Sequence, residues 1–188
     1  TLTARLLGYN SNLSFRGIRS VYLAYNVKEI LPKDIHWLYY GANDIDFNRI
    51  TEPKKLSSNV SPDNKTYLTV EITFSKGDVI DKMDSETLAK KIAEQVERVG
   101  LVAKEHLIDS SDNKEAFVYP LMFKGYQQEL ANTRAIISNF QQLYSIGTGG
   151  DYNYADSQIL FHKAFDTVSI ICGKDSSYTQ TIRKVPLV

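Results

Sequence analysis

Residues 66–75 read TYLTVEITFS, and this stretch decides the class of fold. Every second side chain from Leu68 to Phe74 is apolar, and the side chains between them are mostly polar. In an extended strand a period of two places the two sets on opposite faces. We therefore predict a strand that is buried on one face only.

The sequence on either side of this stretch predicts a sheet. Residues 16–27 (RGIRSVYLAYNV) and 36–40 (HWLYY) are dense in β-branched and aromatic residues, which strands favour. Residues 59–65 contain Pro, Asp and Asn and predict a turn. Further strands are predicted at residues 48–50, 102–108, 116–122 and 142–146, with a polar turn at 109–115 between the second and third of these.

Three segments predict helices, at residues 85–99, 125–140 and 156–172. In the first, Leu88, Ile92 and Val96 form an apolar stripe, Ser85 is a suitable N-cap and Gly100 a suitable end. Cys172 falls on the stripe of the last helix, so we predict that it is buried. Strands followed by helices favour an α+β fold: a largely antiparallel sheet with helices packed on one side.

Composition excludes several classes of protein. The chain has 188 residues, 43% of them apolar, and 22 basic residues balance 22 acidic ones. This suits one compact domain or two small lobes, and it lacks the basic stripe of a nucleic-acid binder. No apolar run approaches the roughly 20 residues that span a bilayer. A single cysteine allows no internal disulfide, which favours a cytoplasmic location. The cysteine and the three histidines are too far apart in sequence to match the ligand spacing of a zinc site.

The segment with the most chemical content is residues 143–166, LYSIGTGGDYNYADSQILFHKAFD. Gly147, Gly149 and Gly150 lie just before a predicted helix. Backbone N–H groups at such a position favour an anion such as a nucleotide diphosphate, although a plain tight turn has the same pattern. It is not the dinucleotide fingerprint, because G-x-G-x-x-G occurs nowhere in the sequence.

This segment resembles the closing motif of the family that includes amine oxidases, protoporphyrinogen-oxidase-like proteins and UDP-galactopyranose mutase. That motif reads G-R-x-G, then Y-x-Y-x-D and a long helix. The matching residues here are Gly147, Gly150, Tyr152, Tyr154 and Asp156. Residues 36–57 and 115–130 resemble two further segments of a branch of this family found in bacterial surface-polysaccharide gene sets. The three matches follow the family's order.

The resemblance implies how the chain is divided. Residues 1–140 would be the substrate-binding α+β domain of an FAD-dependent oxidoreductase, and residues 141–188 the last strand, turn and helix of its FAD-binding lobe. The nucleotide-binding (Rossmann) half would lie amino-terminal to this sequence, which lacks an initiating Met. This chain alone would then bind FAD poorly and be inactive. The implied cofactor contacts are Gly147, Thr148, Gly149, Gly150, Tyr154 and Asp156.

The resemblance also implies a small-molecule substrate held under the sheet. Trp37 and Tyr39 would stack on its rings, and Arg49 would hold an anionic group. Tyr119 and Tyr152 complete the implied substrate set. Ordinary packing is the alternative for the aromatic residues, and an ion pair with Glu52 or Asp46 is the alternative for Arg49.

Two positions depart from the family pattern. Thr148 stands where the family usually has Arg, and Gln158 where the mutases tend to have a second Asp. The implied activity is that of an FAD-dependent oxidoreductase, or a mutase-like isomerase, on a sugar nucleotide or surface-polysaccharide (lipopolysaccharide) precursor. No catalytic residue is assigned, because the flavin carries the chemistry. The alternative is a non-catalytic ligand-binding or protein-interaction domain with a degenerate flavin motif.

Overall fold

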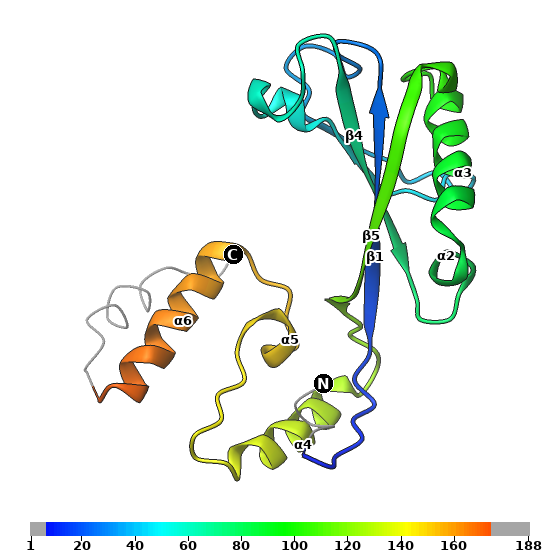
Figure 1. Ribbon diagram of the computed structural model, residues 1–188. Coiled ribbons are helices and arrows are strands. Elements are labelled where there is room, and N and C mark those ends of the chain that lie inside the picture. Colours follow the sequence, from blue (N-terminus) through cyan, green and yellow to red (C-terminus); the bar gives the residue numbers. More distant parts are fainter. Residues whose placement is uncertain (1–6, 174–188) are drawn as a thin grey trace. The chain divides into compact units, whose positions relative to one another are not determined.

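The structure is a computed structural model that describes residues 7–173 (Figure 1). The chain divides into two compact units. Residues 16–116 form the sheet unit. The described residues up to Phe15 and from Phe117 onward form the helical unit. The lobe boundary near residue 140, inferred from the resemblance, stays a prediction.

The sheet is antiparallel and has the strand order β2-β3-β4-β1-β5. The register pairs Gly17 with Phe74 and Tyr25 with Thr66 across the two longest central strands. The strands are β1 (Phe15–Tyr25), β2 (Trp37–Tyr39), β3 (Arg49–Thr51), β4 (Thr66–Phe74) and β5 (Leu107–Pro120). Short 3-10 helices lie at Pro53–Lys55, Ser58–Val60 and Lys104–His106.

One face of the sheet is covered by helix α3 (Ser85–Arg98), which follows the short helix α2 (Val79–Lys82) (Figure 1). Along β4 buried and half-buried side chains alternate without interruption, so the predicted half-buried strand is confirmed. The predicted α+β fold is confirmed too. The N-cap of α3 is Asp84, whose carboxylate accepts from the N–H of Thr87, and not Ser85 as predicted. The core joins the sheet to α3 through Val21, Leu23, Leu68, Val70, Ile72, Leu88, Ile92 and Val96.

A buried carboxylate fastens the loop between β1 and β2 to the sheet. Glu52 has no exposed surface. It accepts hydrogen bonds from the N–H of Leu31 at 2.7 Å, the N–H of Ile30 at 3.1 Å and the hydroxyl of Thr66 at 2.7 Å. Three donors satisfy a group that burial would otherwise penalise strongly. Glu52 therefore has a structural role.

A buried ion pair holds the edge strand β5. The Nε of Arg19 lies 2.5 Å from the carboxylate of Asp112 on β5. Its Nη1 donates to the carbonyl oxygens of Ile80 and Met83, at the two ends of α2. The Arg19 guanidinium lowers the pKa of Asp112 below its ordinary value. The Arg19 side chain thus joins the edge strand β5 to the short helix α2.

Three expectations about individual segments were wrong. The predicted strand at 116–122 belongs largely to the long strand β5, whose polar centre is no turn. Of the strand predicted at 102–108 only Leu107 and Ile108 lie in β5, because Lys104–His106 form a 3-10 helix. Residues 142–146 form no strand. Cys172 is exposed at the end of its helix, because that helix buries none of its described side chains in this chain.

The helical unit contains α4 (Tyr126–Ser138), α5 (Gly147–Asp151) and α6 (Ser157–Ile171). The predicted helices at 125–140 and 156–172 are thereby confirmed, and the glycine-rich turn is itself one short helix. Among residues 7–173 every helix is too short or too polar to cross a lipid bilayer.

Candidate functional site

The face of the sheet opposite α3 is open and carries aromatic and hydroxyl side chains. Strand pairing sets Trp37 opposite Thr51, Thr51 opposite Thr69, and Thr69 opposite Tyr22. Side chains directly opposite one another lie close together on the same face. These residues therefore form a row that crosses the sheet from β2 to β1.

A second row holds the predicted arginine. Tyr39 lies opposite Arg49, and Arg49 opposite Glu71. Arg49 donates to the Glu71 carboxylate, and its guanidinium carbon lies 6.0 Å from the centre of the Tyr39 ring. The hydrogen bond to Glu71 raises the pKa of Arg49 further above its already high ordinary value. Its charge is thus balanced in the sheet itself.

The predicted alternative partners of Arg49 lie elsewhere. Glu52 is buried in its own network, and Asp46 pairs with Lys91 at 2.8 Å. Trp37 and Tyr39 lie outside the core, since their exposed fractions are 49% and 68%, but Tyr39 contacts Arg49 across the strands, so cross-strand packing stays an alternative to substrate contact. The structure therefore brings together Trp37, Tyr39 and Arg49, the three predicted substrate residues of the sheet unit, on one accessible face.

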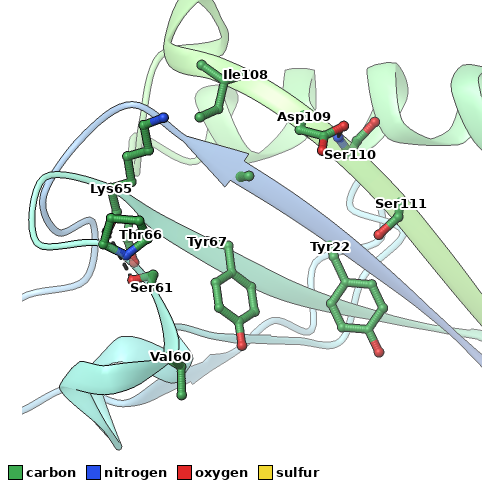
Figure 2. A pocket seen from close by; sticks show the side chains of 12 residues that line it. Tyr22, Val60, Ser61, Lys65, Thr66, Tyr67, Ile108, Asp109, Ser110 and Ser111 are labelled. Atoms are coloured by element: carbon green, nitrogen blue, oxygen red, sulfur yellow. Dashed lines mark hydrogen bonds between the residues drawn. The ribbon is translucent and has the colours of Figure 1, made fainter.

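A hollow of about 260 Å³ adjoins this face (Figure 2). Its walls include Tyr22 and Tyr67 from the sheet, Lys65 from the loop before β4, and Asp109 and Ser111 from β5. Figure 2 shows the rings of Tyr22 and Tyr67 beside each other with their hydroxyls pointing the same way. Sequence reasoning missed this pocket, since the segments that line it are distant in sequence. Only the place of Tyr67 on the polar face of β4 gave a signal.

The glycine-rich segment of the helical unit has an accessible backbone. Gly147 has a positive φ of 83°, which glycine adopts readily. A methyl group added at Gly149 would meet nothing within 4 Å, whereas one at Gly150 would lie 2.7 Å from the carbonyl carbon of Ser145. Gly150 thus packs inward, and Gly149 leaves the backbone open on the other side. That geometry suits close approach by a flat group, although Thr148 supplies no positive charge.

The other predicted cofactor residues lie beside this segment. Tyr154 is exposed, and its ring centre lies 5.1 Å from that of Tyr119, so two predicted site residues meet. Asp156 precedes α6 without capping it and accepts from Gln158 at 3.3 Å. Asp151 ties α5 to α6 through an ion pair with Lys163 at 2.6 Å.

Tyr152 lies inside the helical unit with 1% of its surface exposed. Its hydroxyl is 2.7 Å from the carbonyl oxygens of Ser14 and Leu121, and it accepts from the Ser14 N–H at 3.2 Å. Its ring packs edge-on against Phe15. Burial raises the pKa of Tyr152 above its ordinary value. The structure gives Tyr152 a packing role, and its contact with substrate stays a prediction.

Helix α6 presents an unusual amount of apolar surface. None of its residues is buried, and Phe161, Val168 and Ile170 each expose more than half of their surface. Large exposed apolar patches mark surfaces that another segment or molecule covers.

Comparison with known proteins shows that solved structures share the fold of this chain. The sequence matched no protein-family model and no curated protein. Among solved structures, the reduced form of UDP-galactopyranose mutase matches with a TM-score of 0.76 and 18% sequence identity, over 89% of this chain and 36% of that one. The chain has the fold of part of UDP-galactopyranose mutase.

A second structure has the same kind of fold. A putative protoporphyrinogen oxidase from Exiguobacterium sp. 255-15 matches with a TM-score of 0.59 and 12% identity, over 79% of this chain and 34% of that one. The predicted resemblance of fold to these proteins is confirmed. The chain spans about a third of the length of each.

Proposed function

We propose that this chain is the substrate-binding part, with the closing turn and helix of the FAD-binding lobe, of an FAD-dependent enzyme. Its substrate would be a sugar nucleotide or a surface-polysaccharide precursor. The observation that carries the proposal is the bare aromatic face of a sheet whose fold is that of part of UDP-galactopyranose mutase. The cytoplasmic location that we propose rests on the single cysteine.

The open face would orient the substrate. Trp37 and Tyr39 offer ring surfaces on which a sugar can stack. Arg49 would hold the Tyr39 ring in place and add a polar contact to the substrate. Because Glu71 balances the charge of Arg49, the proposal does not require Arg49 to bind an anion strongly. Tyr119 and Tyr152, in the helical unit, are proposed substrate contacts on the resemblance alone.

FAD would supply the redox chemistry, and this chain would supply part of its binding surface. The open backbone from Gly147 to Gly149, with the side chains of Thr148, Tyr154 and Asp156, would contact it, and Gly150 would allow the turn to close on Ser145. The apolar surface of α6 would pack against the nucleotide-binding lobe, which we propose as the missing partner.

The test uses the complete reading frame that contains this sequence. We expect the purified protein to be yellow and to release FAD on denaturation. Gly149→Val should weaken FAD binding at least tenfold, because a side chain there occupies the space that the flavin needs. Gly41→Val is the matched control, since Gly41 also has open space around it and no positive φ.

A colourless protein that binds no FAD when FAD is added would refute the proposal. So would equal FAD affinity in the two glycine variants. Thr148 favours one second function, a non-catalytic binding domain with a degenerate motif, because the residue provides no charge for a diphosphate. A colourless protein that still binds sugars would support that function.

A further inference from the structure

We propose that the pocket between Tyr22 and Tyr67 is a subsite for an uncharged, hydroxyl-rich ring, a sugar residue that is not the one undergoing reaction. Only its place in a larger reaction rests on the proposed function. The binding itself depends on the sheet unit alone, since every residue that lines the pocket lies there.

The pocket exists because one side chain on the open face is small. Ala24 lies opposite Tyr67, and Tyr22 lies two residues before Ala24 on the same face of β1. The two tyrosines are therefore diagonal neighbours across β1 and β4, within reach of each other. The space above Ala24 measures about 260 Å³. That is below the usual range of roughly 300–1,000 Å³ for drug-sized ligands, so a single ring suits it.

The chemistry of the walls favours a neutral ligand. Two tyrosine rings offer apolar faces, and their hydroxyls together with that of Ser111 offer donors and acceptors. Lys65 and Asp109 bring one charge of each sign, and neither forms an ion pair within the described residues. A phosphate site usually has several cationic donors or a bidentate arginine, and this pocket has neither. Alternating apolar faces and hydroxyl groups match a pyranose or furanose ring.

One wall of the pocket is held in place before any ligand binds. The Lys54 ammonium donates to the carbonyl oxygens of Pro62, Asp63 and Lys65, at 2.8, 2.9 and 2.7 Å. The Ser61 hydroxyl also donates to the Lys65 carbonyl, at 3.0 Å. A loop fixed at this many points loses little freedom when a ligand arrives, so more of the contact energy appears as affinity. Lys54 is thus a positioning residue.

The pocket is continuous with the aromatic face. Tyr22 ends the row that begins at Trp37, and the strands that carry them are three spacings apart, or about 14 Å. A chain of linked sugar rings can therefore lie across the sheet, with one ring at Trp37 and another in the pocket. An extended glycan fits this arrangement better than an isolated monosaccharide.

The test measures binding of lactose, an uncharged disaccharide, to the 188-residue chain by saturation-transfer NMR and calorimetry. UDP and inorganic pyrophosphate serve as charged comparison ligands. We expect lactose to bind, and we expect its protons to receive saturation when the aromatic protons of the chain are irradiated, because the Tyr22 and Tyr67 rings line the pocket. Ala24→Phe, which fills the pocket, and Tyr67→Ala should each weaken binding at least tenfold. Thr73→Phe is the control, because it introduces the same side chain on the same face outside the pocket.

Circular dichroism establishes that each variant is folded. The proposal is overturned if folded Ala24→Phe and Tyr67→Ala bind lactose as the unmodified chain does. It is also overturned if only UDP or pyrophosphate binds, or if lactose does not bind at about 10 mM, which corresponds to an affinity weaker than about 3 kcal/mol. Loss of FAD binding in the complete protein would refute the proposed function and leave this result untouched.

Discussion

Replacing Glu52 by alanine should destabilise the sheet unit more than any exposed substitution. The change leaves the N–H groups of Ile30 and Leu31 and the hydroxyl of Thr66 without their acceptor. Leu31 and Thr66 are buried, as Glu52 is, and Ile30 is partly buried. An unsatisfied buried donor costs about 1–3 kcal/mol. Because water can enter the space left by the side chain, we expect a total near the lower limit for three donors, about 3 kcal/mol.

Urea unfolding at pH 7, followed by circular dichroism, measures this loss. With a slope of about 2 kcal/mol per molar, the midpoint should fall by about 1.5 M. Glu52→Gln keeps the shape and one good acceptor, so it should lose roughly half as much. Glu86→Ala is the control, since Glu86 forms only an exposed pair with Lys90, and its midpoint should not move measurably. A midpoint for Glu52→Ala within about 0.3 M of the unmodified chain would contradict the argument.

Three further outcomes follow from contacts described above. Arg19 lowers the pKa of Asp112, so the pair stabilises the folded state above about pH 4 and loses that effect as the pH falls further. Asp112→Asn removes this pH-dependent contribution. The urea midpoints at pH 6 and pH 3 should therefore differ less in the variant than in the unmodified chain. An equal difference in both proteins would refute this. Tyr152→Phe removes the bonds to the backbone at Ser14 and should cost the helical unit about 1–3 kcal/mol, seen as faster amide exchange in α4 with unchanged exchange in α3. Thr148→Arg in the complete protein should tighten FAD binding by roughly 10- to 150-fold, because a charged hydrogen bond is worth about 1.5–3 kcal/mol, whereas Thr148→Ala should have no effect.

The regular part of the fold could be predicted because it follows simple periods. The alternation in β4 and the stripe in α3 arise from one buried face each, and burial selects those residues directly. The polar centre of the edge strand β5, residues 109–115, could not be predicted as strand, since an edge strand has few packing constraints and a polar run is compatible with a turn. Asp112 pairs with buried Arg19, and these residues are 93 positions apart, so the contact leaves no pattern in the local sequence.

The candidate site divides in the same way. Trp37 and Tyr39 could be placed together because residues two apart on a strand share a face. The pairing of Arg49 with Glu71 could not, because it depends on which strands are neighbours and in what register. The pocket depends on a small residue, Ala24, and on the loop before β4 and strand β5, which meet only in the folded chain.

The chain enters and leaves the sheet unit at neighbouring points. β1 begins and β5 ends at the same end of the sheet, and at Gly17 a methyl group would lie only 2.6 Å from the carbonyl oxygen of Glu115 (Figure 1). A segment whose two ends adjoin can be exchanged as a cassette with little disturbance to the sequence that surrounds it. Evolution can therefore replace or remodel the proposed substrate-binding surface while the segments around Tyr152 keep their own packing.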